Sequence, residues 1–220
     1  MAIHASKEFP GLGFDYDPQK DLYFKVIAKE NLRKLKQLAT GKALLKALRD
    51  ARPGTNNFPK GVNVVLQPPL SRQYSAPGLA GGNANIKIGD QGKYDDWYYG
   101  RKGMLMPSIN AKIACQGVDE SEGVGKMTGN GRVGTGCACW VYYNNNELRT
   151  KDGTWLVPHV TLGHELIHAW HYLNGAAERN DRSEEHMTVG IKGFQNMPFT
   201  ENKLRAEANI PQRTKYFADD

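Results

Sequence analysis

Cysteine is scarce in this chain of 220 residues, and long apolar runs are missing from it. Its three cysteines are an odd number without a paired framework, which excludes a disulfide scaffold and favours a reducing working compartment. The first twenty residues hold no apolar core of the kind that a secretory signal needs, and no segment reaches the length of a membrane span. We therefore expect no membrane partner and no export through the general secretory route.

Positive charge prevails, with 29 basic against 23 acidic residues and a net charge of +6. Many of the cations fall between Lys25 and Arg52, where they suit the solvated faces of helices. A nucleic-acid binder would add interleaved aromatic residues or a known binding motif, and the sequence offers neither. We expect no nucleic-acid partner, while a docking surface for an acidic protein stays open as an alternative.

The composition is that of a globular protein, with 40% hydrophobic and 24% charged residues, and the length suffices for one hydrophobic core. Residues 1–20 are rich in Gly, Pro and Asp and are expected to form a loose N-terminal arm. No repeat and no clear linker divides the remainder. Residues 21–220 are therefore predicted to form a single domain, which we expect to be monomeric.

Helices are predicted in the first and last thirds of the chain. Leucines spaced by three and four over residues 32–48 predict a helical unit, which residues 39–42 split in two, with Thr40 as a candidate cap. A second helical pattern follows Pro158, a residue that suits the first turn of a helix. It ends before Gly175, which suits the left-handed position after a last turn.

Strands are predicted at residues 62–67 (VNVVLQ) and 137–143 (CACWVYY), with a weaker candidate at 85–88 (NIKI). Alternation places Cys137 and Cys139 on one face of their strand, which suits buried small residues better than metal ligands.

The middle of the chain, residues 68–136, is rich in glycine and in loop-forming residues. Its segment GNGRVG, residues 129–134, has the spacing of a dinucleotide-binding loop. However, no convincing strand precedes it, and no helix with a ribose-binding acid follows it. The segment is therefore predicted to be a flexible loop.

The stretch VTLGHELIHAWHYLNG, residues 160–175, concentrates titratable groups in an otherwise apolar helix. His164 and His168, four residues apart, project from one face of this helix and can hold one Zn²⁺. Glu165 then lies next to the first ligand and can act as a general base, which is the HExxH arrangement of metallopeptidases. The spacing therefore predicts amide hydrolysis at a zinc centre.

A catalytic zinc site needs a third protein ligand and an open position for water. His171 lies on the same helix face, but three consecutive turns of a straight helix converge poorly on one tetrahedral ion. We expect His171 to support a ligand or to face the substrate. Spacing alone leaves the third ligand open. The candidates are Glu184, Glu185, His186, Glu201 and Glu207.

The helix resembles the zinc helix of the clostridial neurotoxin light chains, in which a Val-Thr-Leu-x-His-Glu-Leu-Ile-His-Ala-x-His pattern occurs. SEEHMTVG, residues 183–190, is similar to their Glu-Glu-x-x-Thr-Phe-Gly segment, which implies that Glu185 is the third zinc ligand and Glu184 its neighbouring support. RTKY is similar to their Arg-x-x-Tyr, which implies that Arg213 and Tyr216 stabilise the tetrahedral intermediate. The segment between His168 and Glu185 is much shorter than in the neurotoxins, so their substrate specificity does not transfer.

Residues 134–217 and the chain length resemble the NleD-type family of type III effector zinc metalloproteases. Members of that family are injected into host cells and cut host signalling proteins, and the founding type cleaves MAP kinases in the activation loop. The resemblance implies an α+β, zincin-like fold, in which a small twisted sheet packs on the HExxH helix. It places a substrate-pairing edge strand at residues 134–143 and gives Glu201 a supporting role.

These features predict a gluzincin-like zinc endopeptidase that acts in the host cytoplasm on a host protein, with a MAP kinase as the family-level expectation. Zn²⁺ would be bound by His164, His168 and Glu185. The alternative is a non-catalytic binding module in which zinc is structural. A structural site closes all four positions with protein ligands, commonly cysteines, whereas this motif offers histidines and an adjacent base.

Overall fold

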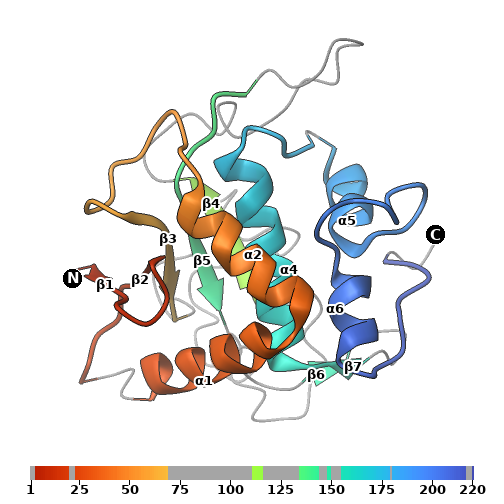
Figure 1. Cartoon of the computed structure of the whole chain (residues 1–220), viewed down its shortest axis with the longest axis horizontal. Coiled ribbons are helices and arrows are strands. Elements are labelled where there is room, and N and C mark those ends of the chain that lie inside the picture. Colours follow the sequence, from red (N-terminus) through yellow and green to blue (C-terminus); the bar gives the residue numbers. More distant parts are fainter. Residues whose placement is uncertain are drawn as a thin grey trace, which may run out of the picture.

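Helix α4 (Pro158–Leu173) runs through the middle of the fold, and the other elements are arranged around it (Figure 1). The computed structural model describes residues 3–19, 23–68, 111–115, 134–143, 148–149, 155–178, 180–216 and 220. Pro158 stands in the first turn of α4, and Gly175, just after it, has a φ of 59°. Both predicted ends of this helix are therefore confirmed.

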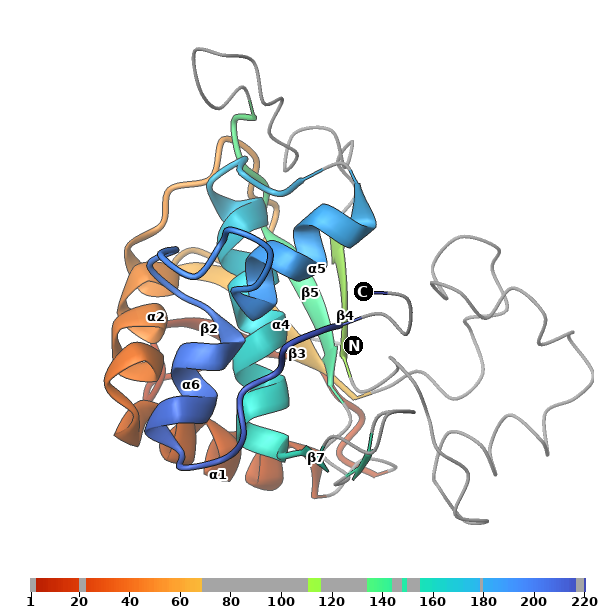
Figure 2. The same cartoon turned by 90° about the vertical axis from the view of Figure 1, so that its right-hand side faces the viewer.

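Two helices precede α4 and two follow it among the described residues. These are α1 (Phe24–Gln37), α2 (Ala39–Asp50), α5 (Asp181–Val189) and α6 (Glu201–Glu207). All four pack against α4, so that α4 is enclosed by helices on one side and by the sheet on the other (Figures 1 and 2).

The predicted break in the first helical unit is confirmed at Leu38, whose extended backbone separates α1 from α2. Thr40 does not cap α2 through its own side chain. Instead, the carboxylate of Glu207 in α6 accepts hydrogen bonds from the Thr40 backbone N–H at 3.0 Å and from its hydroxyl at 2.6 Å. The first turn of α2 is therefore fixed by a residue that is distant in sequence, and local patterning could not reveal this.

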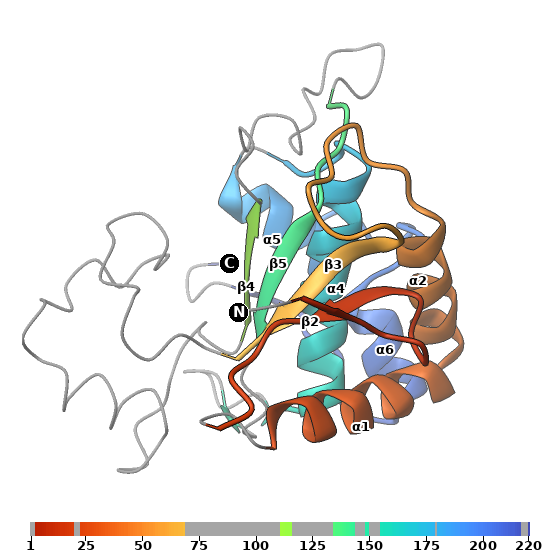
Figure 3. The same cartoon turned by 90° about the vertical axis from the view of Figure 1, so that its left-hand side faces the viewer.

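A five-stranded sheet lies behind the helices, with the strand order β1-β2-β3-β5-β4 (Figures 1 and 3). β2, β3 and β5 run parallel, while β1 and β4 pair antiparallel at the two ends. The strands are β1 (His4–Ala5), β2 (Gly11–Phe14), β3 (Val62–Gln67), β4 (Ala111–Cys115) and β5 (Cys139–Tyr143), and β6 (Leu148–Arg149) pairs separately with β7 (Trp155–Leu156). This small sheet packed on α4 confirms the predicted α+β class.

The edge strand beside α4 is β4 rather than β5. The prediction of an edge strand within residues 134–143 is therefore wrong, because β5 pairs with β3 on one side and with β4 on the other. β5 is thus paired along both of its edges, and its side chains alternate between buried and half-buried. Its nearly continuous apolar run is typical of an inner strand of a parallel sheet, which argues against an edge position.

Apolar side chains fill the space between the sheet and the helices, and α4 contributes most to this layer. Gly163 marks the closest approach: a Cβ at this position would lie 2.5 Å from the side chain of Leu204 in α6 and 3.0 Å from that of Leu35 in α1. The absence of a side chain thus lets three helices meet beside His164. The buried members include Leu32, Leu35, Leu44, Leu48, Val64, Leu66, Val141, Val160, Leu162, Leu166 and Leu204.

The expected loose N-terminal arm is wrong for the described residues 3–19. Phe9, Leu12 and Phe14 are buried in the main core, and β2 pairs with β3 inside the sheet. Gly11 has a φ of 91°, and a Cβ there would come within 2.6 Å of the backbone of Arg49 in α2. The glycine that suggested looseness therefore serves the close packing of a strand against a helix.

Some predicted features lie outside the described residues, namely the NIKI strand and residues 129–133 of GNGRVG. Cys137 and Cys139 are both buried, as the alternation predicted, and no disulfide joins them. Within the described part of the chain, no helix combines the length and apolarity that a membrane crossing requires.

Buried Asn63 in β3 offers a test of the helix-to-sheet packing. Its side-chain amide donates hydrogen bonds to the carbonyl groups of Leu48 at 2.8 Å and Ala51 at 3.1 Å, at the end of α2. We expect Asn63→Ala to lower the free energy of unfolding by about 2 kcal/mol, because two buried acceptors lose their donor. Urea denaturation measures this change. Lys42→Ala, on the exposed face of α2, serves as the control, and an equal loss in both variants would contradict the assignment.

Candidate metal centre

Two buried imidazoles face each other on α4. His164 and His168 stand one turn apart, with ring centroids 4.8 Å apart and an interplanar angle of 78°. Their Nε2 atoms lie 3.1 Å apart. The predicted convergence of these two side chains on one side of the helix is therefore what the structure shows.

Buried carboxylates determine which nitrogen atoms carry the protons. His164 donates from Nδ1 to Glu201 at 2.9 Å, and His168 donates from Nδ1 to Glu184 at 2.7 Å. Because ionised carboxylates only accept hydrogen bonds, both Nδ1 atoms must carry a hydrogen. In the neutral rings, both Nε2 lone pairs then point at the same place. Such an arrangement needs a cation or an added proton between the two atoms.

Glu185 supplies a third ligand atom from α5. Its Oε2 lies 3.2 Å from His164 Nε2 and 3.4 Å from His168 Nε2. This oxygen is buried and faces the two imidazole nitrogens. Two imidazole nitrogens and one carboxylate oxygen, all within 4.8 Å of one another, are a donor set that suits Zn²⁺. The residues present therefore fit a metal ion.

Helix α5 is positioned by caps that are local in sequence. Asn180 precedes it and accepts a hydrogen bond from the Ser183 backbone at 3.2 Å, while Gly190 ends it with a φ of 84°. These caps fix the start and the end of one short helix. As a result, Glu184 and Glu185 both reach α4 from adjacent positions.

Glu184 orients two histidines at once. Its Oε1 accepts from Nδ1 of His168 at 2.7 Å and from Nδ1 of His171 at 2.8 Å, and its Oε2 accepts from the backbone N–H of Glu178 at 2.8 Å. Burial opposes ionisation, but the hydrogen bonds from His168 and His171 hold the pKa of Glu184 well below its usual range. The buried hydroxyl of Thr188 also contacts Oε1, at 3.4 Å. Glu184 thus remains an ionised acceptor behind His168.

Glu201 performs the same task behind His164. It also accepts a hydrogen bond from Arg205 at 2.9 Å and from Arg213 at 3.3 Å. Although burial would raise the pKa of Glu201, the hydrogen bond and charge of His164 and the two arginines lower it to about 2. The carboxylate therefore links the metal cluster to the segment that contains Arg213.

Glu165 is half-buried next to His164. Burial raises the pKa of Glu165 to about 7, against the opposing charges of His164 and His168. A carboxylate with a pKa near neutrality can both accept and release a proton at the pH of a cell, which is the property that a general base requires.

Tyr216 and Arg213 lie against the imidazole pair. The Tyr216 ring stacks on the His164 ring, with centroids 5.9 Å apart and an interplanar angle of 5°, and the Arg213 guanidinium lies 4.4 Å from the centre of the Tyr216 ring. Burial first, and the carboxylates of Glu185 and Glu165 next, raise the pKa of Tyr216 well above its usual value. The phenol therefore keeps its proton and can act as a hydrogen-bond donor beside the cluster.

All of the predicted site residues therefore lie around one cluster. A comparison with protein families shows which family has such a chain. The profile of the peptidase M91 family, described as an effector protein, matches residues 14–216. The chain belongs to the peptidase M91 family. This confirms the resemblance to effector metalloproteases that the motifs indicated.

The comparison with solved structures gives a more distant match. This chain is similar to the light chain of botulinum neurotoxin type G, with 14% sequence identity and a TM-score of 0.40. The match covers 95% of this chain but only 60% of that light chain. No curated protein sequence matches this chain.

Two of the alternative ligands have other roles in this structure. His186 points its Nε2 at Asp220, at 2.9 Å, and Glu207 holds the start of α2. Sequence reasoning missed Asp220, Asn202 and Thr188 as residues that support the site. Thr188 lies in the segment that resembles the light chains and could have been noticed there, whereas no sequence signal pointed to Asp220.

Metal affinity should distinguish the direct ligand from its neighbour. We expect Glu185→Ala to weaken Zn²⁺ binding by at least about a thousandfold, since it removes one of three ligands. Glu184→Ala should weaken it by about 10- to 100-fold, the usual effect of losing an outer partner of a ligand. Chelator competition measures both values, with exposed Glu30→Ala as the control. A larger loss for Glu184→Ala than for Glu185→Ala would contradict the assignment.

The proton balance of the cluster gives a second prediction. Burial lowers the pKa of His164, but hydrogen bonds with Glu185 and Glu201 raise it from 6.5 to about 9. The metal-free protein therefore gains stability from this proton below pH 6.5 and loses it as the pH rises through 9. Because a metal must displace the proton, Zn²⁺ affinity should rise over the same window, by about tenfold per pH unit for each proton released.

Urea denaturation in the presence of a chelator and Zn²⁺ titration, each at several pH values between 6.5 and 9, measure these opposite trends. If the stability of the metal-free protein rose with pH over this window, the assigned proton would be wrong.

Proposed function

We propose that this chain is a zinc-dependent endopeptidase of the gluzincin type that cuts a host protein. The observation that carries the proposal is the convergence of three ligand atoms within 4.8 Å of one another: Nε2 of His164, Nε2 of His168 and Oε2 of Glu185. A structural zinc site would close the fourth position with protein. Among the described residues this cluster offers three ligands and an adjacent carboxylate, which favours a catalytic site over a purely structural one.

The chemistry divides between the metal and the side chains of the chain. When bound by His164, His168 and Glu185, zinc lowers the pKa of a water molecule and polarises the scissile carbonyl group. Glu165 accepts the proton of the attacking water and passes it to the nitrogen of the leaving amine, a task that suits its pKa of about 7.

Tyr216 and Arg213 supply hydrogen-bond donors to the substrate. The protonated phenol of Tyr216 and the guanidinium of Arg213 lie on the His164 side of the cluster. From there they stabilise the negative charge that develops on the carbonyl oxygen in the tetrahedral intermediate. Among the described residues, Nε of Arg213 is buried and has no hydrogen-bond partner, so this guanidinium keeps one unused donor beside the cluster.

The substrate that we propose is an extended loop of a host signalling protein. Among the described strands, β4 is the outer one beside α4, and an extended segment can pair with such an edge through its backbone. The family description as an effector protein supports delivery into a host cell, which we propose occurs through a type III system. A MAP kinase activation loop is the substrate to test first.

Glu165→Ala provides the test of this function. We expect it to abolish cleavage while Zn²⁺ stays bound, because it removes the base and no ligand. The measurement is a comparison of new protein N-termini in host lysate treated with the wild type, with Glu165→Ala or with the exposed control Glu30→Ala. Cleavage by Glu165→Ala at more than a tenth of the wild-type rate would rule out the mechanism, and a purified MAP kinase tests the proposed substrate directly.

A further inference from the structure

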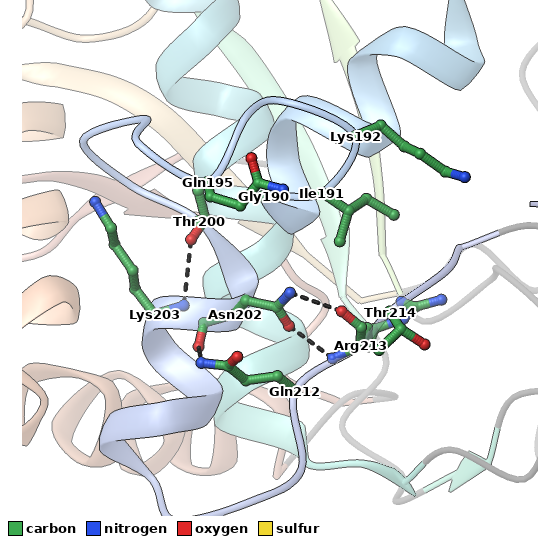
Figure 4. Close-up of a pocket in the computed structure, with 10 residues that line it drawn as sticks. All are labelled: Gly190, Ile191, Lys192, Gln195, Thr200, Asn202, Lys203, Gln212, Arg213 and Thr214. Carbon is green, nitrogen blue, oxygen red and sulfur yellow. Dashed lines mark hydrogen bonds between the residues drawn. The ribbon is translucent and has the colours of Figure 1, made fainter.

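The segment that follows α6 passes over the metal centre, and its first part is anchored by Asn202. In Figure 2 this dark blue segment crosses α4 on its way towards α5. The Asn202 amide donates to the carbonyl oxygen of Arg213 at 2.8 Å and accepts from its backbone N–H at 2.7 Å (Figure 4). One side chain thus satisfies both backbone groups of Arg213, as a neighbouring strand would, and fixes the backbone where the segment reaches the site.

Asp220 anchors the far part of the same segment. Its side chain is only 1% exposed, and its carboxylate accepts from the backbone N–H of Tyr216 at 2.8 Å. It also contacts Nε2 of His186 at 2.9 Å and the guanidinium of Arg182 at 3.1 Å. A buried carboxylate is unfavourable without such partners, so this contact set defines one position for Asp220.

Both side-chain partners of Asp220 belong to α5. His186 directly follows Glu185, the candidate metal ligand, and Arg182 lies one turn earlier. Asp220 therefore ties the backbone of Tyr216 to the helix that supplies the third ligand atom. The same helix sets the position of the ligand and the position of the phenol.

We propose that Asp220 is a positioning residue that holds the Tyr216 side chain at a fixed position relative to the metal centre. This inference rests on the proposed peptidase function. The Tyr216 ring stacks on the His164 ring and lies 4.4 Å from the Arg213 guanidinium. Contacts on the faces of a ring fix its height but leave it free to slide in its own plane. Sliding is what moves the hydroxyl group, and the hydrogen bond from the Tyr216 backbone to Asp220 prevents it.

Loss of this anchor should reduce turnover more than substrate binding. A displacement of about 1 Å at a reacting group can cost about 100-fold in rate. We expect Asp220→Ala to lower kcat by about 10- to 100-fold with KM within about threefold of the wild type. Asp220→Asn keeps an acceptor oxygen for the Tyr216 N–H and should recover part of the loss. Asp50→Ala, which removes an exposed carboxylate at the end of α2, is the matched control.

A double-mutant comparison tests whether Asp220 acts through Tyr216. In a Tyr216→Phe background the phenol is absent, so adding Asp220→Ala should lower kcat by less than about threefold further. A general structural defect would instead reduce kcat by the same factor in both backgrounds. An equal loss in the two backgrounds would overturn the proposal.

Limited proteolysis gives a readout that does not depend on peptidase activity. Lys215 precedes Tyr216, and trypsin cuts after lysine. With the anchor removed, cleavage after Lys215 should accelerate at least about tenfold, while cleavage after Lys42 in α2 should not change. If Asp220→Ala does not fold, Asp220→Asn, which keeps an acceptor for the Tyr216 N–H but loses the charge that faces Arg182, should show a smaller but measurable acceleration.

An unchanged rate of cleavage after Lys215 would overturn the proposal whatever the kinetics show. If the wild type hydrolyses no peptide but Lys215 is protected only when Asp220 is present, the peptidase function is wrong and the anchor is real. The experiments can therefore contradict the peptidase function and the anchoring role of Asp220 independently of each other.

Discussion

The site depends on one electrostatic constraint, the opposition of two imidazole lone pairs across 3.1 Å. Neither ring can turn away, because Glu184 and Glu201 hold the outer nitrogens, and neither carboxylate can move, because each has further buried donors. This arrangement is stable only with positive charge between the rings. The carboxylate oxygen of Glu185 adds a third ligand atom to the two nitrogens, and the three together suit a cation.

Two parts of the chain have different roles around the imidazole pair: one forms the scaffold and the other supplies the site residues. The sheet and the first two helices, from the first two-thirds of the sequence, provide a rigid backing for α4. The ligand atoms and their supports come from residues 164–220, carried by α4, α5, α6 and the segment that follows. Gly163 lets α6 approach α4 closely enough for Glu201 to reach His164.

Much of this site could be predicted because its signals are local. The histidine spacing and the helix ends follow from short-range chemistry. The resemblance to the light chains implied that Glu185 is the third ligand. Three features could not be read in this way. β5 lies inside the sheet because β4 pairs with its outer edge. Glu207 caps a helix more than 160 residues away in sequence. Asp220 meets its partners only when the chain folds back onto α5. Such contacts depend on tertiary structure and leave no periodic trace in the sequence.

The strand order also shapes how this molecule must assemble. β5 stands between β3 and β4, although both of those strands come earlier in the chain. The parallel pair of β3 and β5 is separated by more than seventy residues of sequence. Bringing the two strands together closes a long loop, which makes this step of folding slow. A nascent chain that has reached β4 has no central strand to pair with it. The centre of the sheet therefore cannot form until β5, at Cys139–Tyr143, has been synthesised.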